Sequence, residues 1–147
     1  MSLGMSTPGV AASLFSQTNQ FIWGGSRAEI LEWDAVIDSA AVDAGSHNTK
    51  VLRAGLAMGR VTASGKLRQW NPDADDGTED LVGFLKEETP LIDRFARAQD
   101  AWCPIVVKAP VKAAEILVLG VKFKGSGNDD ASNRTAIRAR FFLDDEV

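Results

Sequence analysis

The 147-residue sequence is poor in the side chains that most often perform chemistry, since it has one cysteine and one histidine. Cys103 cannot form a disulfide within the chain, which suits a reducing compartment such as a bacterial cytoplasm. His47 lies in a polar loop, whereas Cys103 precedes an apolar run and is expected to be a buried thiol. A nucleophile–base pair or a zinc site needs more partners than these two residues offer. We therefore expect no catalytic residue, no metal, no cofactor and no small-molecule substrate.

The sequence also lacks a basic surplus and any long apolar run. It has 16 basic and 20 acidic residues, a net charge of −4, and its lysines and arginines are scattered. This distribution argues against a nucleic-acid partner. No stretch reaches the length of a membrane span or of a secretory signal, so we expect neither a membrane partner nor export.

Calcium is the remaining ion to consider, because residues 73–77 form an acidic loop that ends in glycine. A calcium loop of the helix–loop–helix type would need a ligand at its fifth position and glutamate at its twelfth. Counted from Asp73, these positions hold Gly77 and Phe84. The loop is therefore predicted to be an ordinary solvated turn. Paired acids such as Glu87 and Glu88 are adjacent, so on a strand they would point to opposite faces.

What the sequence does contain begins with an unusual N-terminus. Residues 1–20 are mostly small and polar, which predicts an extended arm that is disordered when free. The apolar cluster Phe21-Ile22-Trp23 and a glycine pair follow. This cluster packs on its own domain or anchors the chain on a partner surface, and the sequence leaves both readings open. We place the arm at residues 1–25 and a single domain at 26–147.

The first half of that domain reads as extended structure. Residues 30–44 favour a strand region, followed by a loop. Residues 56–62 and 66–70 predict a hairpin around the turn 63–65. Residues 81–85 predict a short buried strand, and Gly55 and Gly59 are expected to mark close backbone approach or a bulge.

The second half mixes strands and helices. Thr89-Pro90 resembles a helix start, which predicts a short helix to about residue 99. Residues 105–107 and 116–123 predict strands, 133–140 a helix, and 140–143 a last strand that could close the sheet. The expected fold is α+β and β-rich, a small sheet or barrel-like body with one to three short helices.

One ordered set of motifs goes beyond generic globular character. Leu52-Arg53-Ala54-Gly55-Leu56 is followed by Gly59-Arg60-Val61-Thr62, a polar turn, Asp76-Gly77-Thr78 and Gly83-Phe84-Leu85. This resembles the lambda-type bacteriophage head decoration family, whose members share L-R-x-G-L, G-x-V-T, D-G-T/S and G-I-L in this order. Phe84 stands where the family usually has isoleucine. The motif positions are Leu52, Gly55, Leu56, Gly59, Val61, Thr62, Asp76, Gly77, Gly83 and Leu85.

The resemblance implies a non-enzymatic structural virion protein. It implies a homotrimer, or cement protein, that binds the major capsid protein on the outer surface of the expanded head. There it would stabilise the head against the pressure of packaged DNA, after a period in the host bacterial cytoplasm during assembly. The arm would then make the capsid contact, with Phe15, Phe21, Ile22 and Trp23 as the expected capsid-binding anchors.

Two other readings stay open. The chain could be another β-rich phage structural or carbohydrate-binding module, such as a tail or fibre component, in which an exposed Trp33 or Trp70 stacks on a sugar. It could also be an enzyme that uses His47, Cys103 or an acidic pair, although no recognisable catalytic pattern supports this.

Overall fold

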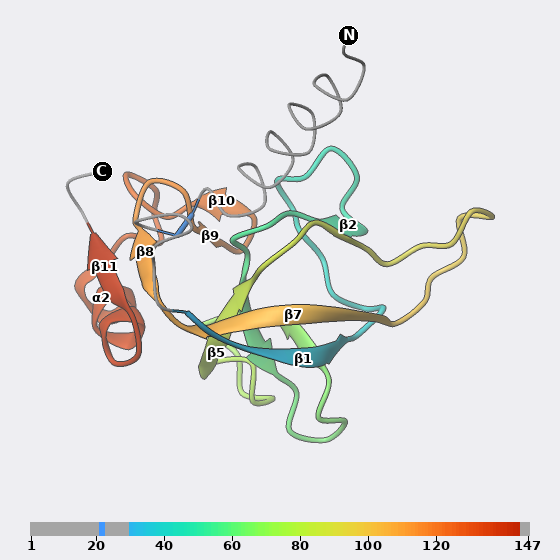
Figure 1. The fold of residues 1–147 in the computed structure, drawn as a ribbon, viewed down its shortest axis with the longest axis horizontal. Helices are drawn as coiled ribbons and strands as arrows, with labels where there is room; N and C mark the ends of the chain where they lie inside the picture. Colours follow the sequence, from blue (N-terminus) through green and yellow to red (C-terminus); the bar gives the residue numbers. More distant parts are fainter. Residues whose placement is uncertain (1–20, 23–29, 145–147) are drawn as a thin grey trace, which may run out of the picture.

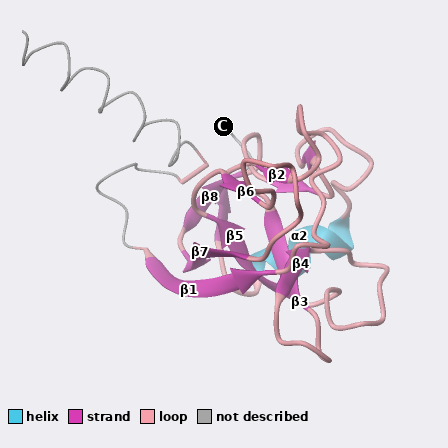
Figure 2. Ribbon diagram, turned by 90° about the vertical axis from the view of Figure 1, so that its right-hand side faces the viewer, coloured by secondary structure: helices cyan, strands magenta, loops and turns pink. Residues whose placement is uncertain are grey.

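A closed five-stranded sheet forms the centre of the computed structural model, which describes residues 21–22 and 30–144. The strands follow one another around the barrel in the order β1-β4-β3-β5-β7, and two views show them enclosing one interior (Figures 1 and 2). The strands are β1 (Leu31–Ile37), β3 (Ala57–Arg60), β4 (Leu67–Gln69), β5 (Leu81–Leu85) and β7 (Ala101–Lys108). The β-rich body expected from the sequence is confirmed.

The barrel closes through a single short contact. All neighbouring strands are antiparallel except β1 and β4, which meet in parallel only at Ile37 and Leu67. The amide of Asp38 donates to the carbonyl of Leu67 at 2.9 Å. The predicted hairpin is confirmed as β3 and β4, with Met58 opposite Gln69. Glycine at Gly65 suits the turn because its φ is +73°.

Smaller elements surround the barrel. Three two-stranded ribbons and the helix α2 account for the remaining regular structure in the described part of the chain. The ribbons pair β2 (Val51–Leu52) with β6 (Thr89–Pro90), β9 (Leu117–Val118) with β10 (Val121–Lys122), and β8 (Pro110–Lys112) with β11 (Phe142–Asp144), and the helix is α2 (Ala131–Arg138). The helix predicted at 133–140 is thus confirmed, but it begins earlier because Asp130 caps it and accepts from the Asn133 amide at 2.8 Å.

The buried apolar side chains form two clusters on opposite faces of the barrel wall. The interior cluster fills the barrel, and the outer cluster lies between the barrel and the segments 109–143. Side chains alternate along a strand, so Phe84 enters the outer cluster while its neighbour Leu85 enters the interior one. The wall strand β5 is therefore apolar on both faces.

The helix predicted after Thr89-Pro90 is wrong. Thr89 and Pro90 form β6 and pair with β2. The chain after Pro90 then turns back on itself, so that Ile92 and Ala98 form an antiparallel bridge. Asp93 accepts bonds from the amides of Phe95 at 2.8 Å and Arg97 at 3.0 Å, which offers the backbone an alternative to helical bonding. Ala96 has a φ of +62°, a left-handed conformation that ends any helix there. This loop is the long excursion between β5 and β7 (Figure 1).

Two strand predictions near the C-terminus also need correction. Residues 116–123 do not form one strand, because Leu119 and Gly120 both have positive φ and fold the chain into the β9–β10 hairpin. The last strand, β11, does not close the main sheet. It pairs in parallel with β8, placing Leu143 opposite Val111. No helix among the described residues is both long and apolar enough to cross a membrane.

Candidate interaction surfaces

The aromatic cluster at the N-terminal boundary packs on its own domain. Phe21 is fully buried, its ring lies 6.2 Å from that of Phe84, and its carbonyl accepts from the Lys112 amide at 2.8 Å. Ile22 is 2% exposed and bridges Val111. In this conformation neither side chain is available as a capsid anchor, so the domain begins before the predicted boundary at residue 26. The other expected anchors, Phe15 and Trp23, and most of the arm lie outside the described residues.

Most of the motif residues are packed at or beside the barrel, whereas Thr62 and Asp76 are exposed. A Cβ at Gly59 would collide with the backbone of Thr78, and one at Gly83 would collide with the carbonyl of Val106. The register between β3 and β5 shifts at Gly59, as a bulge does. The expectation of close approach or a bulge there is confirmed. The apolar motif residues Leu52, Leu56, Val61 and Leu85 are buried.

The turn that carries Asp76-Gly77-Thr78 holds itself together. Asp76 accepts from both the amide and the hydroxyl of Thr78, at 3.1 and 2.6 Å, and the bond from the hydroxyl is the main reason that the pKa of Asp76 lies below its usual value. Gly77, at a φ of +104°, lies directly against Thr62 and leaves no room for a side chain. The Thr62 amide donates to the Asp76 carbonyl at 2.9 Å. The spacing G-x-V-T … D-G-T therefore describes one packed corner.

A buried carboxylate holds the loop that follows β1, which ends at Ile37 although extended structure was predicted to residue 44. Asp43 is fully buried and receives the Arg53 guanidinium in two bonds of 2.8 Å, as well as the Arg53 amide at 3.0 Å. The bond to Asp43 raises the pKa of Arg53. The same guanidinium also donates to the carbonyl of Gly120. Such a bidentate pair fixes geometry, so Arg53 ties loop 38–50 to the β9–β10 turn.

Among the side chains considered for chemistry, the buried Cys103 lies beside Glu87, to whose carbonyl its thiol donates at 3.8 Å. Cys103 is 3% exposed and burial raises the pKa of its thiol, whereas His47 is exposed in its loop. Within residues 21–22 and 30–144, no group of three His, Cys, Asp or Glu side chains is placed to hold a metal ion.

Exposed apolar side chains are the more informative feature. Trp70 is 1% exposed and its indole donates to the Glu79 carbonyl at 2.8 Å, so it cannot stack on a ligand. Trp33 on β1 and Trp102 on β7 are 55% and 74% exposed. The signal for Trp102 was present in the sequence, because a buried Cys103 turns its neighbour to the opposite face. Among the described residues, the other large exposed apolar side chains are Ile30, Leu31, Phe95, Val121 and Phe142.

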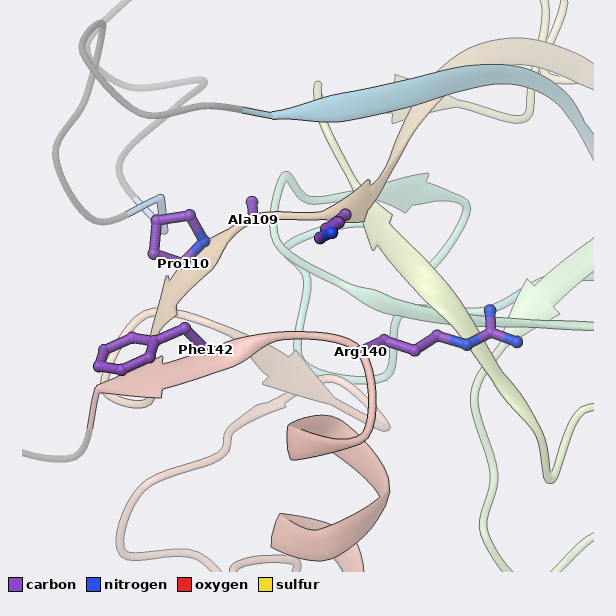
Figure 3. Close-up of a pocket in the computed structure, with 5 residues that line it drawn as sticks. Ala109, Pro110, Arg140 and Phe142 are labelled. Atoms are coloured by element: carbon purple, nitrogen blue, oxygen red, sulfur yellow. The ribbon is translucent and has the colours of Figure 1, made fainter.

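A shallow hollow lies where β7 passes into β8, beside β11 (Figure 3). It has a volume of about 350 Å³ and is lined by Lys108, Ala109, Pro110, Arg140 and Phe142. Figure 3 shows the Phe142 ring facing the Pro110 ring, with the Arg140 side chain directed away from both. The hollow is open and largely apolar, and the two cationic residues Lys108 and Arg140 are among those that line it.

Comparison with known proteins adds no assignment. No family model matches the chain, and no curated protein sequence matches it.

Proposed function

We propose that this chain is a structural virion protein that binds as homotrimers to the outer surface of an expanded phage capsid. Its partner there is the major capsid protein, and its role is to stabilise the head against internal DNA pressure. The protein is present in the host bacterial cytoplasm during assembly and on the virion afterwards. It is not an enzyme and uses no cofactor.

The observation that carries this proposal is the ordered motif set between Leu52 and Leu85. Within this set Gly59, Gly77 and Gly83 are each packed against backbone or side-chain atoms that exclude a Cβ. The need for glycine at these three positions gives the match a structural reason within this fold and so supports it. The exposed rings of Trp33 and Trp102 support a binding protein.

The arm is the part of the proposal that can be tested most directly. A chain that starts at Gln20 lacks most of the small polar segment but keeps Phe21 and Ile22 in the core. We expect it to fold normally and to lose binding to expanded heads, because the arm supplies the contact. Full-length protein should bind expanded but not unexpanded heads, measured by sedimentation with purified heads and by counting copies per capsid subunit. Normal binding by the shortened chain would refute the role of the arm.

A matched control separates loss of the arm from loss of the fold. A chain that starts at Trp23 also lacks Phe21 and Ile22, so it should be destabilised by several kcal/mol, as expected when two buried large side chains are removed. If neither full-length nor shortened protein binds heads of either form, the virion role itself is refuted.

A carbohydrate-binding module of a tail or fibre is the second candidate, favoured by one observation. Trp33 and Trp102 expose their rings on the surface, as a sugar-stacking site requires. Binding on a glycan array that is lost in Trp102→Ala or Trp33→Ala would support it. Trp70, considered for this role from the sequence, is excluded because it is buried.

A further inference from the structure

Strand β1 has a strand partner along only one of its edges for most of its length. It pairs with β7 from Leu31 to Ile37, but it meets β4 only at Ile37. Among the residues that the structure describes, residues 31–36 have no strand on the other side. Figure 1 shows this barrel strand beside β7.

The register determines which backbone groups face this open edge. Asp34 lies opposite Pro104, which has no N–H and whose carbonyl accepts from the Lys86 amide at 3.1 Å on the far side. The Asp34–Pro104 pair is therefore one of the non-hydrogen-bonded pairs that alternate along an antiparallel ladder. It follows that Glu32 and Asp34 both direct their N–H and C=O groups away from β7, to the open edge.

The side chains along this edge combine apolar and acidic character. Leu31 and Trp33, on one face, are 50% and 55% exposed. Glu32 and Asp34, on the other face, are exposed acids, and Glu32 pairs with Lys86 at 2.8 Å. Natural proteins usually protect a free edge with proline, lysine or a covering loop. Between Glu32 and Val36 the described structure has no proline, lysine or covering loop, and the charges on this part of the edge are the acids Glu32 and Asp34.

We propose that the open edge of β1 binds an extended segment of a partner protein in which basic and apolar side chains alternate. The segment would add a strand antiparallel or parallel to β1, taking up the free backbone groups of Glu32 and Asp34. A basic side chain would face Asp34, which forms no ion pair among the described residues, while Glu32 is already paired with Lys86. The apolar side chains of the segment would cover Leu31 and Trp33.

A second copy of β1 does not fit this edge. An antiparallel pair of two β1 strands that uses the same free backbone groups would place Glu32 of one copy opposite Asp34 of the other. Like charges directly opposite each other across strands are destabilising. The acidic side chains of β1 therefore favour pairing with a basic strand and disfavour pairing with a second copy of β1. This inference does not depend on the proposed virion role, because any partner with such a strand would satisfy it.

The test uses the full chain and a short, end-blocked, dye-labelled peptide that alternates lysine and valine. The control peptide has the same composition with its lysines and valines in two separate blocks. We expect the alternating peptide to bind by fluorescence anisotropy, and to slow hydrogen exchange at the amides of Glu32 and Asp34. These two amides should exchange rapidly in the free, dilute protein. The block peptide should do neither.

Asp34→Pro is the decisive variant, because it removes an N–H that faces the open edge and none that faces β7. We expect it to fold and to weaken peptide binding by about tenfold or more, since it removes a hydrogen bond and the charge together. Asp34→Ala, which keeps the N–H, should weaken binding only a few fold. Asp75→Ala, which removes an exposed acid from loop 73–77, should leave binding unchanged.

Three results would overturn the proposal. One is failure of the alternating peptide to protect the two amides of the wild-type chain, a measurement that does not depend on how any variant folds. Another is unchanged peptide binding by a folded Asp34→Pro variant. The third is protection of these amides that rises with protein concentration in the absence of peptide, which would make a second copy the occupant.

Discussion

The two apolar clusters on either side of the barrel wall are built in different ways. The interior cluster draws mainly on barrel strands, with Ile37, Met58, Leu67 and Ile105 among its members. The outer cluster draws on the wall and on segments from both ends of the described chain, including Phe21, Phe84 and Phe141. The interior cluster thus holds the barrel closed. The outer cluster attaches Phe21, Ile22, α2 and β11 to the outside of the barrel.

The position of a strand relative to the two clusters explains its sequence pattern, as β5 and β1 show. β5 separates the two clusters, so its residues Leu81–Leu85 are apolar almost throughout, as in strands that are covered on both faces. β1 borders only one cluster at one end, and its first four residues are exposed. A continuous apolar run marks the shared wall, and a mixed run marks the open edge.

The largest loss of stability is expected when a large side chain is removed from either cluster. Strand β5 supplies one such side chain to each. Phe84→Ala should cost about 3–5 kcal/mol of unfolding free energy and Leu85→Ala about 2–5 kcal/mol, because both side chains are fully buried. Phe84 also lies 4.8 Å from the Phe141 ring in an edge-to-face contact. Urea denaturation would measure both variants. A small cost for Phe84→Ala alone would mean that the outer cluster is not part of the cooperative fold.

A smaller loss of stability is expected when one methyl group is added to strand β5, between the two clusters. Gly83→Ala would push a Cβ into the backbone of β7, so it should cost about 1–3 kcal/mol or more. Gly65→Ala is the matched control, since its Cβ would meet open space and the only cost is the positive φ, about 1 kcal/mol. Thermal unfolding would rank the two variants. Equal costs would show that the wall can move apart to accept a side chain.

Acid should weaken the closure of the barrel. Asp38 accepts from the Ala40 amide and Asp100 from the Lys66 ammonium, and these bonds lower the pKa of each carboxyl below its ordinary value of 3.8. A lowered folded pKa gives stability that is present above 3.8 and is lost as the pH falls through the folded value.

Denaturation at a series of pH values below about 5 would measure this loss. Asp100→Asn should flatten the dependence of stability on pH, whereas Asp80→Asn, at an exposed loop position, serves as the control. An unchanged acid slope in Asp100→Asn would contradict a role for this contact near the junction of β1 and β4.

The smallest effect is expected at side chains that belong to neither cluster. Trp33→Ser and Trp102→Ser should each change the unfolding free energy by no more than about 0.5 kcal/mol, because both rings are mostly in solvent. Trp70→Ser, in the outer cluster, should cost several times more. A large loss of stability in Trp102→Ser would show that this side chain is structural and not part of a binding surface.

Local patterns determined much of this protein. The β3–β4 hairpin, the buried strand β5, the loop at 73–77 and the buried Cys103 were all predictable, because each depends on turn chemistry or on apolar residues close together in sequence. The close approach at Gly59 was predictable for the same reason. The absence of a recognisable catalytic pattern was equally a property of composition.

Tertiary structure decided the rest, because it depends on contacts between distant residues. Thr89 and Pro90 have the local signature of a helix start, but pairing with β2 holds them extended. Phe21 and Ile22 could have served a partner, but the outer cluster buries them against residues far along the chain. The open edge of β1 could not be foreseen, since only the closed barrel shows which side of that strand has no neighbour.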